Sequence, residues 1–169
     1  MSTYLVLTII ADDKPGIVEK LSATIADHGG NWLESRMAQM AGKFAGILRV
    51  SIDEDKTNSL VSALASLGTK GIQVKVEDPG AIAAEAGTHL QLSVVGNDRP
   101  GIVREVSRAL ATLGVNVLEL TTSCEPAEMS AVPLFRSEAL VSVPAGMDTD
   151  DISDALEALS DDLMVEIER

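Results

Sequence analysis

The sequence predicts an α+β protein built from two copies of one βαββαβ unit, each with an antiparallel sheet and both helices on one face. The strongest observation is an internal repeat: residues 12–34 (DDKPGIVEKLSATIADHGGNWLE) match residues 97–119 (NDRPGIVREVSRALATLGVNVLE) at 11 of 23 positions without gaps. A constant offset of 85 residues relates the two stretches, which indicates duplication of one folding unit. Alternating and helical apolar spacings on either side of the repeat supply the element order.

The first unit opens with a strand and a helix. Leu5, Leu7 and Ile9 alternate with other residues at the period of a strand. Pro15 ends this strand and suits the first helical turn, where its missing N–H group is not needed. Apolar residues then recur at helical spacing until a Gly-Gly pair at 29–30, which predicts the end of the helix.

The rest of the first unit follows the same logic. Two further strands are expected at 31–40 and 44–52, joined by a hairpin turn at 41–43. Helical spacing from Leu60 to Leu67 predicts a second helix closed by Gly68. The second unit repeats this order, with strands at 89–95, 115–123, 134–143 and 163–168 and helices at 100–113 and 150–160. We therefore expect domains at 1–78 and 88–169, and a linker of small residues at 79–87.

A βαββαβ unit is the split βαβ, or ferredoxin-like, arrangement, whose two helices leave the other sheet face bare. The residues expected on that open face are Tyr4, Val6 and Ile10 in the first unit and His89, Gln91 and Val95 in the second. The first set is more apolar, and a unit of about 80 residues is small for independent stability. Both points predict that the two units pack together, or that a second chain covers the face.

Composition excludes several functions. The net charge of −13 gives a surface that repels phosphate backbones, so direct nucleic-acid binding is not expected. The single cysteine, Cys124, excludes an internal disulfide, and with two histidines no Cys/His zinc cluster can form. No apolar run reaches the roughly 20 residues that span a bilayer. We expect a cytoplasmic protein without metal or cofactor.

The turn from the first strand into the first helix is the candidate ligand site. A helix N-terminus suits a carboxylate, a glycine allows close approach to the backbone, and an aspartate attracts an ammonium group, so a small zwitterion fits. An asparagine that opens the next strand offers both a donor and an acceptor. The proposed ligand-binding residues are Asp13, Lys14, Pro15, Gly16 and Asn31, with their counterparts Asp98, Arg99, Pro100, Gly101 and Asn116.

The same residues have a purely structural interpretation. An aspartate before a helix often caps it or complements its dipole. Pro-Gly and asparagine are also common in turns.

The DDKPGIV and NDRPGIV stretches resemble the signature loop of ACT domains, which are ligand-binding modules that sense amino acids. Two such units and little else resemble the glycine cleavage system transcriptional repressor family, over nearly the whole chain. The resemblance implies effector sites at domain interfaces, lined by the two loops, Asn31 and Asn116. It also implies a non-catalytic protein that contacts a DNA-binding activator, with glycine or a similar amino acid modulating the contact.

Two alternatives remain open. One is a protein–protein interaction module without a ligand, and the other is an enzyme on the same scaffold, such as a small acyl phosphate hydrolase. Such an enzyme needs an arginine over the phosphate, whereas Lys14 stands opposite Arg99 in the two copies. Cys124 is expected to be a buried or half-buried bystander without a basic neighbour. The acidic run 148–154 lacks the glycine and distal glutamate of a calcium loop and is explained by a helix N-terminus.

Overall fold

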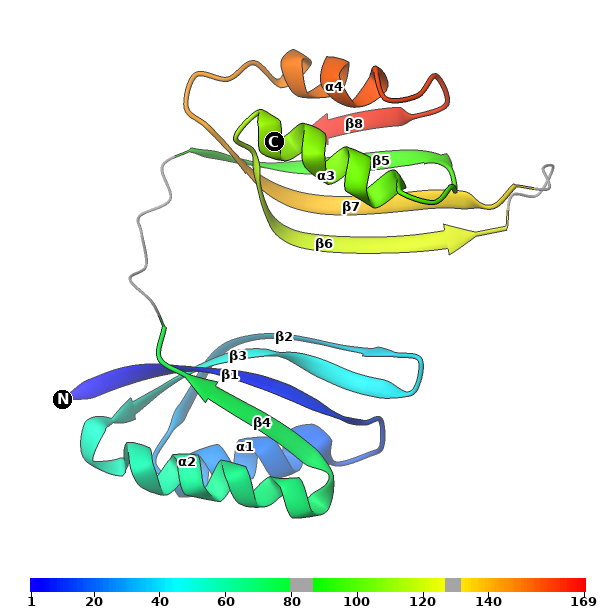
Figure 1. The fold of residues 1–169 in the computed structure, drawn as a ribbon. Coiled ribbons are helices and arrows are strands. Elements are labelled where there is room, and N and C mark those ends of the chain that lie inside the picture. Colours follow the sequence, from blue (N-terminus) through cyan, green and yellow to red (C-terminus); the bar gives the residue numbers. More distant parts are fainter. Residues whose placement is uncertain (80–86, 127–131) are drawn as a thin grey trace. The chain divides into compact units, whose positions relative to one another are not determined.

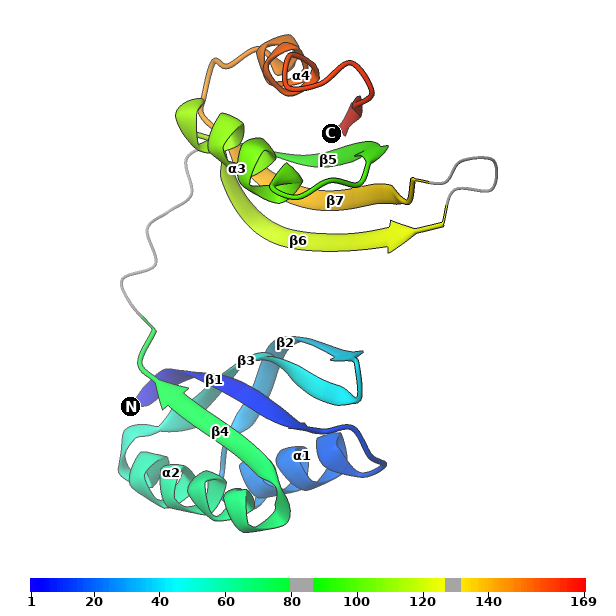
Figure 2. The same cartoon turned by 45° about the vertical axis from the view of Figure 1, so that its right-hand side comes forward.

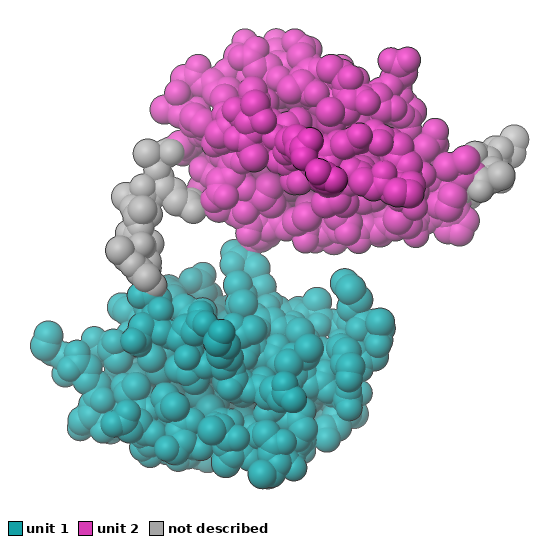
Figure 3. All heavy atoms as spheres, viewed as in Figure 1, with its two compact units in different colours: residues 1–82 teal, residues 83–169 magenta. Residues whose placement is uncertain are grey.

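The computed structural model describes residues 1–79, 87–126 and 132–169. The chain divides into two compact units, residues 1–82 and 83–169 (Figure 3). Each unit is described by itself. Most of the predicted linker and the centre of the loop between the second and third strands of the second unit, including Met129, lie outside the described residues.

The first unit has the predicted βαββαβ order. Its elements are β1 (Ser2–Asp12), α1 (Ile17–Asp27), β2 (Asn31–Met40), β3 (Lys43–Asp53), α2 (Thr57–Ser66) and β4 (Ile72–Glu77). The sheet order is β2-β3-β1-β4 and every neighbouring pair is antiparallel. Ala41 and Gly42, both at positive φ, form the turn between β2 and β3 as expected for a two-residue hairpin.

The second unit repeats this topology. Its elements are β5 (Thr88–Asn97), α3 (Ile102–Thr112), β6 (Asn116–Glu125), β7 (Leu134–Val143), α4 (Thr149–Glu157) and β8 (Met164–Glu168), with sheet order β6-β7-β5-β8. The correspondence extends to an irregularity: β2 has a register shift between Trp32 and Glu34, and β6 has one between Val117 and Glu119. The same offset of 85 therefore relates the two bulges.

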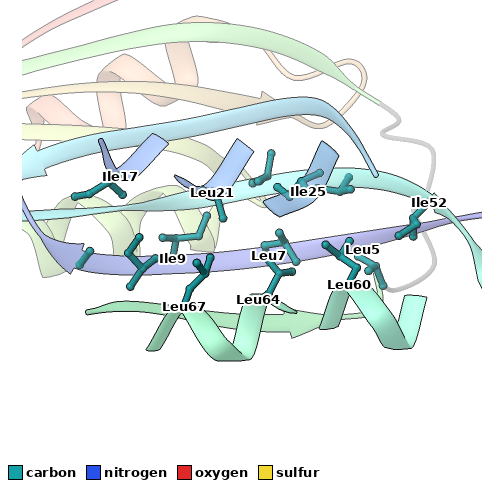
Figure 4. Close-up of a cluster of buried hydrophobic side chains, with 14 residues drawn as sticks. Leu5, Leu7, Ile9, Ile17, Leu21, Ile25, Ile52, Leu60, Leu64 and Leu67 are labelled. Carbon is teal, nitrogen blue, oxygen red and sulfur yellow. The ribbon is translucent and has the colours of Figure 1, made fainter. Parts of the chain in front are cut away.

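In each unit the two helices cover one face of the sheet (Figures 1 and 2). Apolar side chains from β1, α1 and α2 meet between these layers in the first unit (Figure 4). Leu7, Leu21 and Leu64 are completely buried there, and each such side chain stabilises the fold by about 1.5–3 kcal/mol. The second unit has its own core, which includes Leu92, Ile152 and Leu156 and the aromatic Phe135. Both cores are mainly aliphatic because the chain has so few aromatic residues.

The predicted open face is confirmed. Tyr4 and Ile10 are 47% and 46% exposed, while their β1 neighbours Leu5 and Ile9 are buried. The guanidinium carbon of Arg49 on β3 lies 5.4 Å from the Tyr4 ring centroid on this face. Such a cation–π contact stabilises an exposed site by about 0.5–1 kcal/mol.

Two predicted helix boundaries are wrong for the same reason. Pro15 lies two residues before α1 rather than in its first turn, because Gly16 takes a left-handed conformation that cannot belong to a right-handed helix. Gly68 does not stop the second helix, since a 3-10 turn at Leu67–Lys70 continues the chain and Gly71, with φ 82°, ends it.

Within the described ranges, no helix is both long and apolar enough to cross a membrane.

Candidate functional site

The loops between β1 and α1 and between β5 and α3 have matching backbone geometry. Gly16 has φ 94° and ψ 1°, and Gly101 has φ 86° and ψ 2°. A Cβ atom at either position would meet no atom within 4 Å, so the backbone conformation, not crowding, requires glycine there. Each loop is also tied to its neighbouring hairpin: the N–H groups of Asp13 and Asp98 donate to the carbonyl oxygens of Gly42 and Pro133, both at 2.9 Å.

The capping interpretation of Asp13 and Asp98 is wrong. Each helix begins at a left-handed glycine, and in the described structure no side chain caps α1 or α3. By contrast, Asp148 does cap α4, accepting a hydrogen bond of 3.0 Å from the Asp150 N–H group. The first N–H groups of α1 therefore keep their partial positive charge toward the loop, where a carboxylate would be favoured. In α3 the Ile102 N–H group donates to the Arg99 carbonyl oxygen at 3.3 Å, so the N–H groups that follow it have this role.

The first loop borders a shallow hollow of about 250 Å³, lined by Asp13, Lys14, Gly16, Ile17, Val18, Glu19 and Phe44. Three of the predicted site residues thus share one hollow, and Pro15 is exposed beside it. Phe44, which supplies an apolar wall from β3, was not predicted. The Lys14 ammonium group donates to the Lys70 carbonyl oxygen at 3.5 Å and so leans toward the turn before β4.

An ion pair lies on the side of the first loop that faces the β2–β3 hairpin. The Lys43 ammonium group binds the Asp12 carboxylate and lowers the pKa of that carboxyl group, with a smaller contribution from the charge of Lys14. Asp13 takes part in no ion pair among the residues that the structure describes. Its carboxylate therefore remains available for a ligand's ammonium group.

The loop of the second unit is held differently. Arg99 Nη1 lies 2.5 Å from Glu105 Oε2, so its guanidinium group folds back onto the first turn of α3. The N–H group of Asn97 donates to Asp162 Oδ2 at 2.7 Å. The Ser160 hydroxyl, then the Asn97 N–H group, and more weakly the Arg99 charge lower the pKa of Asp162. Asp162 thus fixes the end of β5, a role the sequence analysis missed.

Cys124 is exposed, so its predicted burial is wrong. The register places it opposite Phe135 near the end of β6. Partial desolvation of the sulfur raises the pKa of the thiol, and the neighbouring Asp98 carboxylate raises it further. Cys124 is therefore a neighbour of the candidate loop of its own unit.

Asn31 and Asn116 lie far from the loops of their own units. Asn31 pairs with Ser51 of β3, whereas Asp12, at the start of the loop, pairs with Lys43. Eight residues of strand separate these levels, which is roughly 26 Å at 3.3 Å per residue. The second unit shows the same separation, with Asn116 opposite Ser142 and Asn97 opposite Leu134. One small ligand cannot contact both groups within one unit.

The other candidate residues form no reactive cluster in the described ranges. The His28 ring nitrogen Nδ1 lies 2.9 Å from the Thr24 carbonyl oxygen, at the end of α1. No group of three or more metal-binding side chains comes together among the described residues.

Comparison with known proteins identifies the family. The model of the ACT domain matches residues 3–77 and again residues 88–168. The glycine cleavage system transcriptional repressors of Escherichia coli (strain K12) and Shigella flexneri are each 24% identical to the chain over 167 residues, covering 95% of the chain and 85% of the relative.

Solved structures share the tandem arrangement of elements. An unknown protein from Galdieria sulphuraria has a TM-score of 0.81 at 27% identity, covering 99% of this chain and 98% of that one. A protein assigned as a glycine cleavage system transcriptional repressor has a TM-score of 0.71 at 18% identity, covering 99% and 97%. The two family matches span almost the whole described structure, and the chain therefore belongs to the ACT-domain family, with two ACT domains in tandem.

Proposed function

We propose that this chain is a non-catalytic, cytoplasmic regulator that senses a small amino acid, glycine or one close to it in size. In this proposal the amino acid modulates contact with a partner transcription factor of glycine cleavage or one-carbon metabolism. The two relatives that are 24% identical to the chain are both named glycine cleavage system transcriptional repressor, and this supports the proposal. The strongly acidic composition supports a protein partner in place of direct DNA contact, because a net charge of −13 repels phosphate.

The loop geometry is the observation on which the proposal depends. Both loops hold a left-handed glycine at a helix N-terminus without a side-chain cap, next to an exposed aspartate. A zwitterion supplies the carboxylate that the helix favours and the ammonium group that the aspartate favours. Gly16 and Gly101 also leave room for direct approach to the backbone.

Such a ligand regulates a partner only by binding more tightly to one of two states. A tenfold difference in ligand affinity between the free and partner-bound states corresponds to about 1.4 kcal/mol of coupling. Enzymatic activity is not part of the proposal, because the Cys124 thiol, which is the nucleophile beside the second loop, has a raised pKa and neighbours a carboxylate, whereas an activated thiol needs a lowered pKa.

Isothermal titration calorimetry with glycine, serine and alanine tests the sensor. We expect heat with at least one of them, and a loss of affinity of tenfold or more in Asp98→Ala and in Asn116→Ala. Asp161→Ala, an exposed residue outside the loop, is the matched control. Absence of heat and of a thermal shift with every amino acid refutes sensing, and unchanged affinity in both variants refutes the site. If both variants lose ligand affinity, a second ACT domain must complete the site, because Asn116 lies at the end of its sheet away from the Asp98 loop.

A second candidate is an interaction module that needs no ligand. The pairing of Arg99 with Glu105 favours it, because this ion pair fills part of the second loop with the protein's own charges. Partner capture that is unaffected by any amino acid would support this alternative. Homodimer formation is compatible with both candidates.

A further inference from the structure

The second unit has an apolar hollow that lies between α3 and its edge strand β6. Its volume is about 40 Å³, and its walls are almost entirely apolar. The lining residues are Leu92, Val103, Val106, Ser107, Leu110, Val117, Leu120, Thr122, Phe135, Ser137 and Ala139. At its mouth, Val103, Val117 and Leu120 are 44%, 37% and 52% exposed. Exposed apolar side chains gathered in this way favour a binding surface.

The repeat shows which substitutions open this hollow. Trp32 pairs with Val50 in the first unit, and Val117 pairs with Val141 at the equivalent level of the second. By the same register, Thr122 replaces Met37 and Ala139 replaces Leu48. Trp32 and Met37 pack against the core of the first unit. Three smaller side chains at the equivalent positions leave space in the second unit, while two lining residues are larger there, with Leu120 in place of Ser35 and Ser137 in place of Gly46.

The hollow runs along a strand edge that can accept a further strand. β6 is the outermost strand of its sheet, and it has ten residues. One side of its backbone therefore presents N–H and C=O groups away from β7. Extended peptides bind such edges by main-chain hydrogen bonds, and a groove beside the edge selects one of their side chains.

Charge on the helix that lines the hollow indicates what kind of segment fits. Arg104 and Arg108 are exposed one turn apart on α3, the helix that supplies Val103 and Ser107 to the hollow. Neither arginine forms an ion pair with the residues that the structure describes. The equivalent positions of α1 hold Glu19 and Ala23, so this positive charge is specific to the second unit of a strongly acidic chain. Carboxylates on a partner would complement it.

We propose that the groove between α3 and β6 docks an extended segment of a partner protein. The segment adds to the edge of β6, inserts an aliphatic or aromatic side chain into the hollow, and carries carboxylates that face Arg104 and Arg108. This inference rests on the proposed function in that it assigns the partner surface, but it requires no amino-acid ligand.

Selection from a displayed library of random dodecapeptides tests the groove on the full chain. We expect enriched peptides to combine alternating apolar residues with Asp or Glu, and the best of them is then synthesised for affinity measurements. Val117→Trp fills the hollow with the residue that the first unit holds at the equivalent position, and should weaken binding at least tenfold. Arg104→Glu with Arg108→Ala should weaken it about tenfold, and less at high salt. Lys20→Ala, which removes an exposed positive charge from α1 of the first unit, is the control, expected to have no effect.

Three results would overturn the proposal: no enriched peptide, enrichment of basic peptides, or binding that survives filling of the hollow in a variant with native circular dichroism. Sedimentation of the wild-type chain tests the other occupant. A dimer that the filled variant converts to a monomer would show that a second copy occupies the groove. Failure of the calorimetric test with amino acids would leave the peptide result intact, so the two proposals fail separately.

Discussion

Gly16 and Gly101 hold the same left-handed conformation at the start of equivalent helices, 85 positions apart in the sequence. The carbonyl oxygen of each accepts the first helical hydrogen bond at 3.0 Å, from the N–H groups of Lys20 and Glu105. The side chains around the two glycines differ, yet the backbone turn is the same. The turn itself is thus what the two units have in common at the candidate site.

Replacement of either glycine by alanine should destabilise its own unit by about 1–2 kcal/mol, the cost of a Cβ atom in a left-handed conformation. No neighbouring atom would clash with the added Cβ, so the effect should not exceed that range. Gly68→Ala is the control, because Gly68 is not at positive φ and also has space around it. Urea denaturation followed by circular dichroism measures all three. Equal stability of Gly16→Ala and Gly68→Ala would contradict the assigned conformation.

Each unit should keep its stability when the core of the other is damaged. Leu64 is fully buried in the first core, and its truncation to alanine should cost about 2–5 kcal/mol there. Ile152→Ala should act likewise on the second core, because the two clusters share no residue. Hydrogen exchange followed by mass spectrometry resolves the two units. Faster exchange in β5 or β7 after Leu64→Ala would contradict independent cores.

Local patterns predicted the elements because strand and helix periods differ. The strand at Asn31–Met40 and the strand at Leu134–Val143 have the predicted bounds. Helix starts were displaced because glycine conformation is not visible in a pattern of apolar residues. In the same way, nothing local distinguishes Gly68 from Gly71 as the residue that ends the helical segment.

The candidate site was predictable only where its residues are neighbours in the chain. Asp13 and Gly16 share a hollow because they are only three positions apart in the chain. The contact of Asn97 with Asp162 spans 65 residues and depends on the pairing of β5 with β8. Asn31 shows the opposite effect, since the strand direction carries it away from the loop. The pairing of strands in the folded sheet therefore determines both that Asn97 meets Asp162 and that Asn31 lies away from the loop.

Asp162 should make the second unit sensitive to acid. Its pKa is lowered in the folded state, so its contribution is present above the carboxyl group's ordinary pKa and is lost as the pH falls through the lowered value. Asp162→Asn should therefore cost about 1 kcal/mol at pH 7, as loss of one hydrogen bond does. The difference from wild type should shrink as the pH falls through the lowered pKa of Asp162. The neighbouring exposed Asp161→Asn should change neither value, and thermal melts across this pH range compare the three proteins.

Cys124 should report on the charge and occupancy of the second loop. Because the Asp98 carboxylate contributes to the raised pKa of the thiol, Asp98→Asn should lower that pKa and speed alkylation by iodoacetamide at pH 8. Glu105→Gln, which alters the Arg99 ion pair without touching the thiol, is the control and should leave the rate unchanged. Partial desolvation is the larger cause of the raised pKa, so the thiol of Asp98→Asn should still titrate above its ordinary range.

A bound ammonium group beside Asp98 would neutralise the same carboxylate, so a saturating amino-acid effector should shift the pH dependence of wild-type alkylation in the direction of Asp98→Asn. An effector that binds by calorimetry yet leaves this pH dependence unmoved would place its ammonium group away from Asp98.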